Sequence, residues 1–131
     1  MISVSLANLN NVAREVQRRN VEKGFYEKEK NIGEMIALMH SELSEALEAD
    51  RKNRYAKADN ETWDMLDESP SEADFMDLFR ETVKDTFEDE LADAFIRILD
   101  MAGYLKIDLE RHVEYKMRYN QGRQKYHGKR Y

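Results

Sequence analysis

The stretch EDELADAFIRILD, residues 88–100, predicts a long helix in the interior of a helical protein. Successive residues of an α-helix turn by about 100°, and on that wheel the apolar side chains of residues 86–105 cover more than half of the circumference. A helix that is apolar on most sides is buried. The narrow polar strip that remains consists of Glu90, Asp93, Arg97, Asp100 and Tyr104.

A second stretch, HSELSEALEADR at residues 40–51, also places acids beside an apolar face. In a helix over residues 31–52, Glu42 falls inside the apolar arc and Glu45 falls at its edge. An isolated buried carboxylate is costly unless it is paired, protonated or bound to a cation. Two acidic pairs, each with a three-residue spacing, therefore predict a shared metal site.

The ligand types restrict which metal this site binds. The chain contains no cysteine, and neither the pair Glu42 and Glu45 nor the pair Glu90 and Asp93 encloses a histidine. Oxygen ligands alone favour a hard cation, Mg²⁺ or Mn²⁺. A di-iron bundle is a weak alternative, because neither His40 nor His112 follows a glutamate by three residues. Simple ion pairing is a second alternative, since Arg97 lies four residues after Asp93.

The whole chain has the composition of one helix-rich domain over residues 1–131. Apolar residues make up 41% and charged residues 37%, and glycine and proline are scarce. The apolar spacing predicts an all-α fold with four main helices. Residues 53–84 form an acidic insert, in which EADFMDLFRETV at residues 72–83 has room for a short helix. The main helices are expected over 3–21, 31–52, 86–105 and 108–122.

The charge distribution limits the partners. Residues 59–93 hold fourteen acids and two bases, whereas residues 115–131 hold six bases and no acid. A net charge of −6 argues against long nucleic acid as a partner, because contacts with phosphates dominate that affinity. We find no apolar run of membrane-spanning length and no secretion signal, so a cytoplasmic location is expected.

The two acidic stretches resemble a known motif. SELSEALEADR followed by EDELADAFIRILDMAGYLKIDLE is similar to the Glu-x-x-Glu and Glu-x-x-Asp pairs of the MazG-like nucleoside triphosphate pyrophosphohydrolases. The closing KMRYNQGRQKYHGKRY, residues 116–131, resembles the C-terminal end of that family. The resemblance covers most of residues 20–52 and 85–131. Residues 53–84 depart from it, because they are longer and more acidic than the compact family core.

The resemblance implies a four-helix MazG-like bundle core that is completed by formation of a homodimer or tetramer. It implies Mg²⁺-dependent cleavage of a nucleoside triphosphate to the monophosphate and pyrophosphate, in nucleotide-pool house-cleaning. The implied metal ligands are Glu42, Glu45, Glu90 and Asp93, with Glu42 or Glu45 as the catalytic base. The implied phosphate-binding residues are Lys116, Asn120 and Arg123. Weaker substrate-binding candidates are Asn20, Lys23 and Phe25.

Two other functions stay open at this point. The chain can be a nucleotide sensor without turnover, or a helical module whose acidic stretch contacts a basic partner. The preferred base and sugar are also open. The aromatic candidates for stacking on a base are Phe25, Tyr26, Trp63, Tyr115 and Tyr119.

Overall fold

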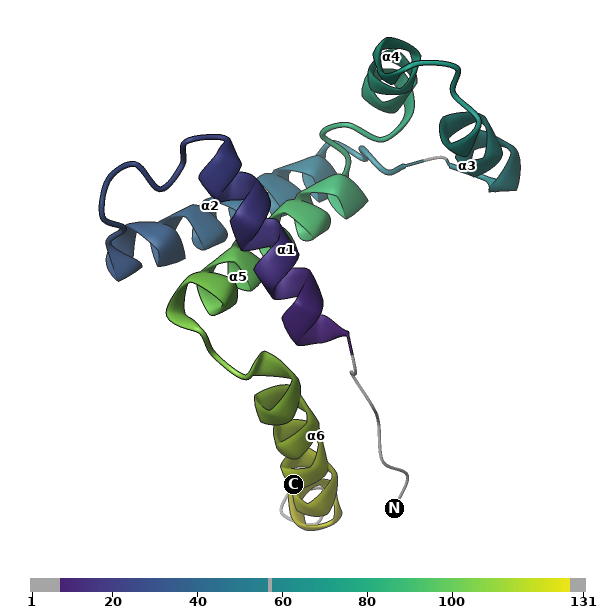
Figure 1. Ribbon diagram of the computed structural model, residues 1–131. Coiled ribbons are helices and arrows are strands. Elements are labelled where there is room, and N and C mark those ends of the chain that lie inside the picture. Colours follow the sequence, from purple (N-terminus) through teal and green to yellow (C-terminus); the bar gives the residue numbers. More distant parts are fainter. Residues whose placement is uncertain (1–7, 57, 128–131) are drawn as a thin grey trace. The chain divides into compact units, whose positions relative to one another are not determined.

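The computed structural model describes residues 8–56 and 58–127, and all of its regular elements are helices (Figure 1). The predicted all-α class is therefore confirmed. Of the described helices, none is long and apolar enough to cross a membrane. The predicted start of the first helix, residues 3–7, lies outside the described residues. The helices are α1 (Leu9–Glu22), α2 (Ile32–Arg51), α3 (Asn60–Asp67), α4 (Glu72–Thr82), α5 (Phe87–Leu105) and α6 (Leu109–His127).

The acidic insert contains two helices, α3 and α4. The second matches the expected short helix, whereas α3 lies in a segment for which no period was recognised. Both begin at side-chain caps: Asp59 accepts a hydrogen bond from the amide of Thr62 (2.9 Å), and Ser71 accepts one from the amide of Asp74 (3.1 Å). Such caps satisfy backbone donors that the first turn leaves without partners.

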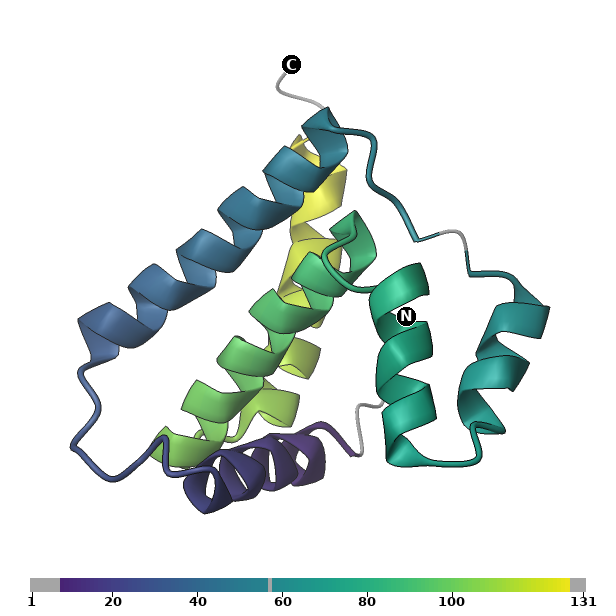
Figure 2. The same cartoon turned by 90° about the horizontal axis from the view of Figure 1, so that it is seen from above.

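The chain divides into two compact units. The α2–α4 unit comprises residues 30–97, which include α2, α3, α4 and the first part of α5. The α1/α6 unit comprises residues 1–29 and 98–131. Within the α2–α4 unit, α3 and α4 lie side by side (Figure 2).

Hydrogen bonds and a contact between two aromatic rings join the start of α5 to the segment that follows α2. The amide of Phe87 donates a hydrogen bond to the carbonyl of Arg54 (2.8 Å), and the amide of Ala56 donates to the carboxylate of Glu88 (3.0 Å). The rings of Tyr55 and Phe87 pack with their centroids 5.4 Å apart. These contacts set the register of α5 against the end of α2, and so they position the acids of both helices.

A small apolar core holds the α1/α6 unit together. Ala13 of α1 and Leu99 and Ala102 of α5 are almost fully buried, and Leu9, Val16 and Leu109 pack against them. Gly103 allows the close approach of α1, because a Cβ atom there would lie 2.6 Å from the carbonyl oxygen of Ala13. The side chain of Asn10 joins α1 to α6 through Asp108 (2.8 Å) and the amide of Glu110 (3.1 Å).

The expectation that the third main helix is buried on most sides is wrong for the single chain. Phe95, Ile96 and Ile98 of α5 keep between 41 and 48% of their surface exposed. On α2, Leu43 and Leu47 keep about half of theirs exposed. Burial was inferred from the width of the apolar arc, but the other described helices do not cover that whole arc.

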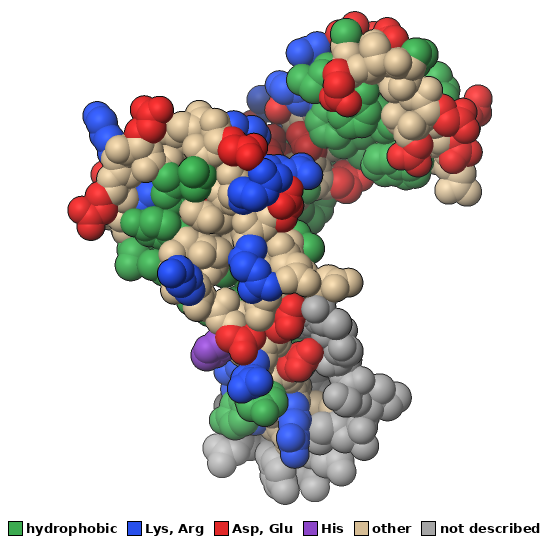
Figure 3. Space-filling model, in the orientation of Figure 1, with side chains coloured by type: hydrophobic (Ala, Val, Ile, Leu, Met, Phe, Trp, Pro, Cys, Tyr) green, Lys and Arg blue, Asp and Glu red, His purple; other side chains and the backbone are tan. Residues whose placement is uncertain are grey.

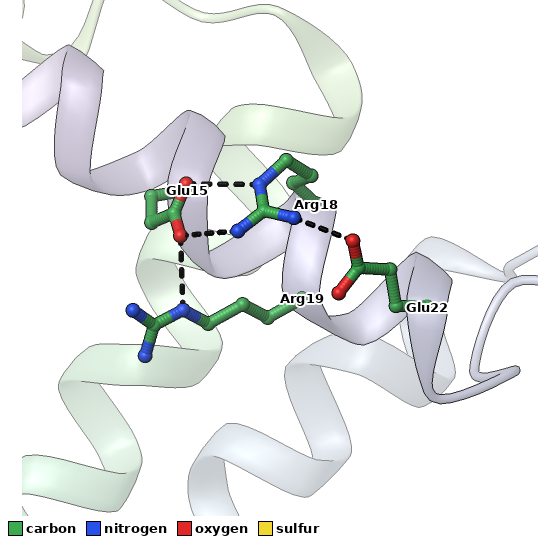
Figure 4. A network of polar contacts seen from close by, with 4 residues as sticks. All are labelled: Glu15, Arg18, Arg19 and Glu22. Atoms are coloured by element: carbon green, nitrogen blue, oxygen red, sulfur yellow. Dashed lines mark hydrogen bonds and ion pairs between the residues drawn. The ribbon is translucent and has the colours of Figure 1, made fainter.

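The exposed side of α1 carries a network of ion pairs (Figure 4). Arg18 contacts both Glu15 (2.6 Å) and Glu22 (2.5 Å), and Arg19 contacts Glu15 (3.0 Å). The hydrogen bond from Arg18, followed by that from Arg19, lowers the pKa of Glu15 to about 2. Exposed pairs of this kind add little stability. They do neutralise the two arginines, which makes these side chains poor candidates for binding phosphate.

Candidate metal centre

Helices α2 and α5 bring three glutamates together. Glu42 and Glu45 lie one turn apart on α2, and Glu90 lies near the start of α5. Each offers a carboxylate oxygen, and these oxygens all lie within 4.8 Å of one another. Glu42 is only 8% exposed and Glu90 only 5%, whereas Glu45 is exposed. The three residues, which we call the glutamate cluster, therefore combine two buried ligands with one that reaches solvent.

Within the glutamate cluster, Glu90 has the least favourable surroundings for a negative charge. Its buried Oε2 atom has no hydrogen-bond partner within the described part of the chain. Burial, followed by the neighbouring carboxylates of Glu45 and Glu42, raises the pKa of Glu90 to about 8. A carboxylate in such a place either keeps a proton or binds a cation.

Arg97 neutralises only part of this charge. Its Nε atom donates a hydrogen bond to Oε1 of Glu42 at 2.9 Å. Burial by itself raises the pKa of Glu42, but the hydrogen bond from Arg97 and the contacts with Glu45 and Glu90 outweigh burial and lower it. The four-residue spacing left open an ion pair between Arg97 and Asp93, but Arg97 forms its ion pair with Glu42, across the two helices. One guanidinium cannot balance three carboxylates.

Asp93, the fourth predicted ligand, stands apart from the glutamate cluster. It lies one turn after Glu90 and is half-buried, but it does not belong to the group of oxygens within 4.8 Å. Burial, followed by the charges of Asp89 and Glu42, raises the pKa of Asp93. The structure thus brings together three of the four predicted ligands. Asp93 lies outside this group, but it is near enough for the charge of Glu42 to raise its pKa.

Asp85 and Asp89, which were not among the predicted ligands, form a second acidic group with Glu90. Their carboxylate oxygens and one of Glu90 also lie within 4.8 Å of one another. Thr86 caps the start of α5, because its Oγ1 accepts a hydrogen bond from the amide of Asp89 at 3.3 Å. Asp85 precedes α5 and has a φ of 63°, so helical spacing could not place it beside Asp89; its amide instead donates a hydrogen bond to the carboxylate of Asp89 at 2.9 Å.

The glutamate cluster fits a small divalent cation. Mg²⁺ binds oxygen ligands octahedrally at about 2.0–2.1 Å, so adjacent ligands are about 3 Å apart and opposite ligands about 4.2 Å apart. The three oxygens already lie within 4.8 Å of one another, so side-chain rotation can bring them to these spacings. The buried oxygen of Glu90 that lacks a donor is the atom that most requires a cation.

The predicted substrate-binding residues belong to the α1/α6 unit. Lys116 and Arg123 of α6 both approach the ring of Tyr119, with the charged groups 5.1 and 5.6 Å from the ring centre. Asn120 follows Tyr119, and all four residues are exposed. At this helical spacing they form one polar face. Asn20, Lys23 and Phe25 lie at the end of α1 and in the turn after it.

Comparison with known proteins adds no assignment. No protein-family model, curated protein or solved structure matches this chain. The assignment of the site therefore rests on the carboxylates themselves, on their burial and on their charge.

We expect the metal-free protein to lose stability as the pH rises from about 4.5 to about 8. The folded state keeps Glu90 protonated up to a pKa of about 8, whereas an ordinary glutamate ionises near 4.5. Between these values the folded state binds more protons, so Glu90 makes the free energy of unfolding fall with rising pH. Denaturation in EDTA at about pH 5, 6.5 and 8 measures this slope. An identical slope in Glu90→Gln, which does not titrate there, would contradict the assignment.

Proposed function

We propose that this chain is a Mg²⁺-dependent nucleoside triphosphate pyrophosphohydrolase, which cleaves a (d)NTP to the (d)NMP and pyrophosphate. The observation that carries the proposal is the glutamate cluster, with the buried oxygen of Glu90 that has no donor. The resemblance of the acidic motifs and the closing segment to MazG-like enzymes supports it. We also propose the cytoplasmic house-cleaning role and the four-helix core that this resemblance implies.

The residues of the site have distinct tasks in this reaction. Glu42, Glu45 and Glu90 would hold Mg²⁺, with Asp93 as an additional ligand. When bound, the ion neutralises phosphate charge and makes a water molecule more acidic. Arg97 keeps Glu42 ionised and oriented. As water oxygen bonds to phosphorus, the bond that links the α- and β-phosphates breaks and pyrophosphate leaves.

Glu45 is the best candidate for the general base. It is the exposed member of the glutamate cluster, and it is not held by Arg97 as Glu42 is. A carboxylate that reaches solvent can accept the proton of the attacking water and release it afterwards. Between the two catalytic candidates from the sequence, Glu42 is therefore better suited to holding the metal and Glu45 to moving the proton.

The identity of the products tests this function. The protein is incubated with a panel of NTPs and dNTPs, with Mg²⁺ or with EDTA, and the products are separated. Nucleoside monophosphate and pyrophosphate in equal amounts, formed only with Mg²⁺, are expected. Nucleoside diphosphate and orthophosphate would indicate a phosphatase. Nucleotide binding without any cleavage would instead favour a sensor.

Lys116 and Arg123 are proposed to contact the triphosphate. Replacing either with alanine is expected to lower kcat/KM about 10–150-fold, because a charge-assisted contact contributes about 1.5–3 kcal/mol. Arg118→Ala is the control, since Arg118 lies on the same helix two residues away and therefore faces in another direction. Assays at one fixed ionic strength compare the three variants. Equally small losses of kcat/KM in all three variants would mean that α6 attracts the substrate only through its overall positive charge.

Self-association is proposed to cover the exposed apolar side chains of α2 and α5. Phe95→Lys is expected to shift a homodimer or tetramer to the monomer, because it puts a charge into an apolar interface. Val21→Lys is the matched control: Val21 of α1 is also 48% exposed but lies on neither helix. Sedimentation velocity at micromolar concentration distinguishes these outcomes. A wild-type protein that is monomeric at this concentration would contradict the proposed self-association.

A further inference from the structure

A cavity of about 770 Å³ lies within the α2–α4 unit. Side chains of α3, α4 and α5 line it, and its wall is mostly apolar. In the space-filling view, hydrophobic side chains gather on the α3 and α4 part, with acidic side chains around them (Figure 3). Pockets for small molecules typically have volumes of about 300–1,000 Å³ and mainly apolar walls. The size and the lining are therefore those of a ligand pocket.

Three aromatic rings contribute to the wall of this cavity. Trp63 comes from α3, and Phe75 and Phe79 come from α4. The two phenylalanine rings stack on each other with their centroids 5.9 Å apart. Trp63 keeps 47% of its surface exposed. Flat aromatic faces that remain accessible favour a flat aromatic ligand over an aliphatic one.

The cavity reaches acids that lie beside the glutamate cluster. Asp85, Asp89 and Asp93 all line it. Asp89 also has a carboxylate oxygen within 4.8 Å of one from Glu90, which belongs to the glutamate cluster. One molecule with an anionic, metal-binding end and a flat aromatic end can therefore reach both places.

We propose that this cavity takes the heterocyclic base of the nucleoside triphosphate, which stacks on the aromatic rings of α3 and α4 while its phosphates lie at the glutamate cluster. The inference rests on the proposed function and assigns a role to the insert that departs from the compact MazG-like core. Residues 60–82 are then the segment that holds the base. The rings recognise a flat π-system, which every base has.

Fluorescence of Trp63 tests this directly, because it is the only tryptophan of the chain. Deoxynucleoside α,β-imidotriphosphates, which resist cleavage, are titrated in the presence of Mg²⁺. Inorganic tripolyphosphate with Mg²⁺ is the control, since it offers the phosphates without a base. The expected result is a saturable change in Trp63 emission with the nucleotides and little change with tripolyphosphate. Equal changes with both, or none with either, would overturn the proposal.

Phe75→Leu keeps an apolar side chain and removes the aromatic face. Its dissociation constant for the nucleotide is expected to rise roughly 5–150-fold, the range for loss of base stacking, with tripolyphosphate binding unchanged. Met65→Leu is the control, because Met65 lies on α3 and is 53% exposed but does not line the cavity. If Phe75→Leu loses its helical circular dichroism, Phe79→Leu replaces it. Affinities equal to that of the control variant would overturn the proposal.

These results separate failure of the pocket from failure of the enzyme. Pyrophosphate release with an unresponsive Trp63 overturns the pocket and leaves the hydrolase intact. A response of Trp63 to nucleotides without any hydrolysis supports the pocket and contradicts the hydrolase. Emission that depends on protein concentration but not on nucleotide would mean that a second copy of the chain fills the cavity, which overturns the proposal.

Discussion

Replacement of Glu90 with glutamine is expected to lower turnover by more than about 100-fold and to raise the melting temperature of the metal-free protein at about pH 8. Glutamine keeps the size of the side chain and removes its charge. Loss of an outer partner of a metal ligand already costs about 10–100-fold, so loss of a ligand itself costs more. The gain in stability follows because the buried carboxylate of Glu90 is costly when it ionises beside Glu42 and Glu45.

Glu48→Gln is the matched control for this variant. Glu48 lies on α2 one turn after Glu45 but is half-exposed and forms ion pairs with Arg51 and Lys52. Its replacement should leave both turnover and melting temperature nearly unchanged. Turnover is followed by pyrophosphate release, and melting is followed in EDTA. A Glu90→Gln variant with near-normal Mg²⁺-dependent rates would remove Glu90 from the site.

Gly103→Ala is expected to destabilise the protein by about 1–3 kcal/mol, the usual cost of forcing an extra group into a packed interior. The added Cβ atom would lie 2.6 Å from the carbonyl oxygen of Ala13 and 2.9 Å from Cβ of Gln17. Neither α1 nor α5 can give way without disturbing the core of the α1/α6 unit, because Ala13 is itself 2% exposed.

Gly122→Ala is a control for which the expected change in the free energy of unfolding has the opposite sign. Gly122 lies within α6, and a Cβ atom there would meet nothing within 4 Å. Alanine in a helix interior is favoured over glycine by about 0.5–1 kcal/mol, so this variant should be more stable than the wild type. Chemical denaturation of the two variants measures the difference. The same sign for both would show that α1 does not pack on Gly103.

The sequence predicted the parts of the fold that depend on helical periodicity. The helices α2 and α5 are long enough for the pattern to repeat several times, and their positions were recognised closely. The grouping of Glu42, Glu45 and Glu90 followed from the cost of burying charge. In contrast, α3 has only eight residues, so its period is too short to detect and its start depends on the cap at Asp59.

Other features depend on contacts between helices, which periodicity does not contain. The spacing along α5 offered Asp93 as a possible partner of Arg97, but the ion pair of Arg97 joins it to Glu42 of α2. The aromatic cavity likewise needs α3 and α4 beside α5. The four-residue spacing of Phe75 and Phe79 is a signal from which a shared helix face could have been predicted. The apolar arc of α5 predicted that the helix is buried. The width of that arc does not indicate which surface covers it, and several of its side chains are exposed in the single chain.

Binding of Mn²⁺, observed by electron paramagnetic resonance, tests the central claim most directly. Free Mn²⁺ has a strong signal that weakens when the ion binds protein, and Mn²⁺ favours the same oxygen ligands as Mg²⁺. The wild type is expected to bind Mn²⁺ saturably, with Mg²⁺ competing, and Glu90→Gln is expected to lose this binding while Glu48→Gln keeps it. Wild-type protein that leaves the Mn²⁺ signal unchanged, or equal binding by Glu90→Gln, would contradict the assignment of the glutamate cluster as a metal centre.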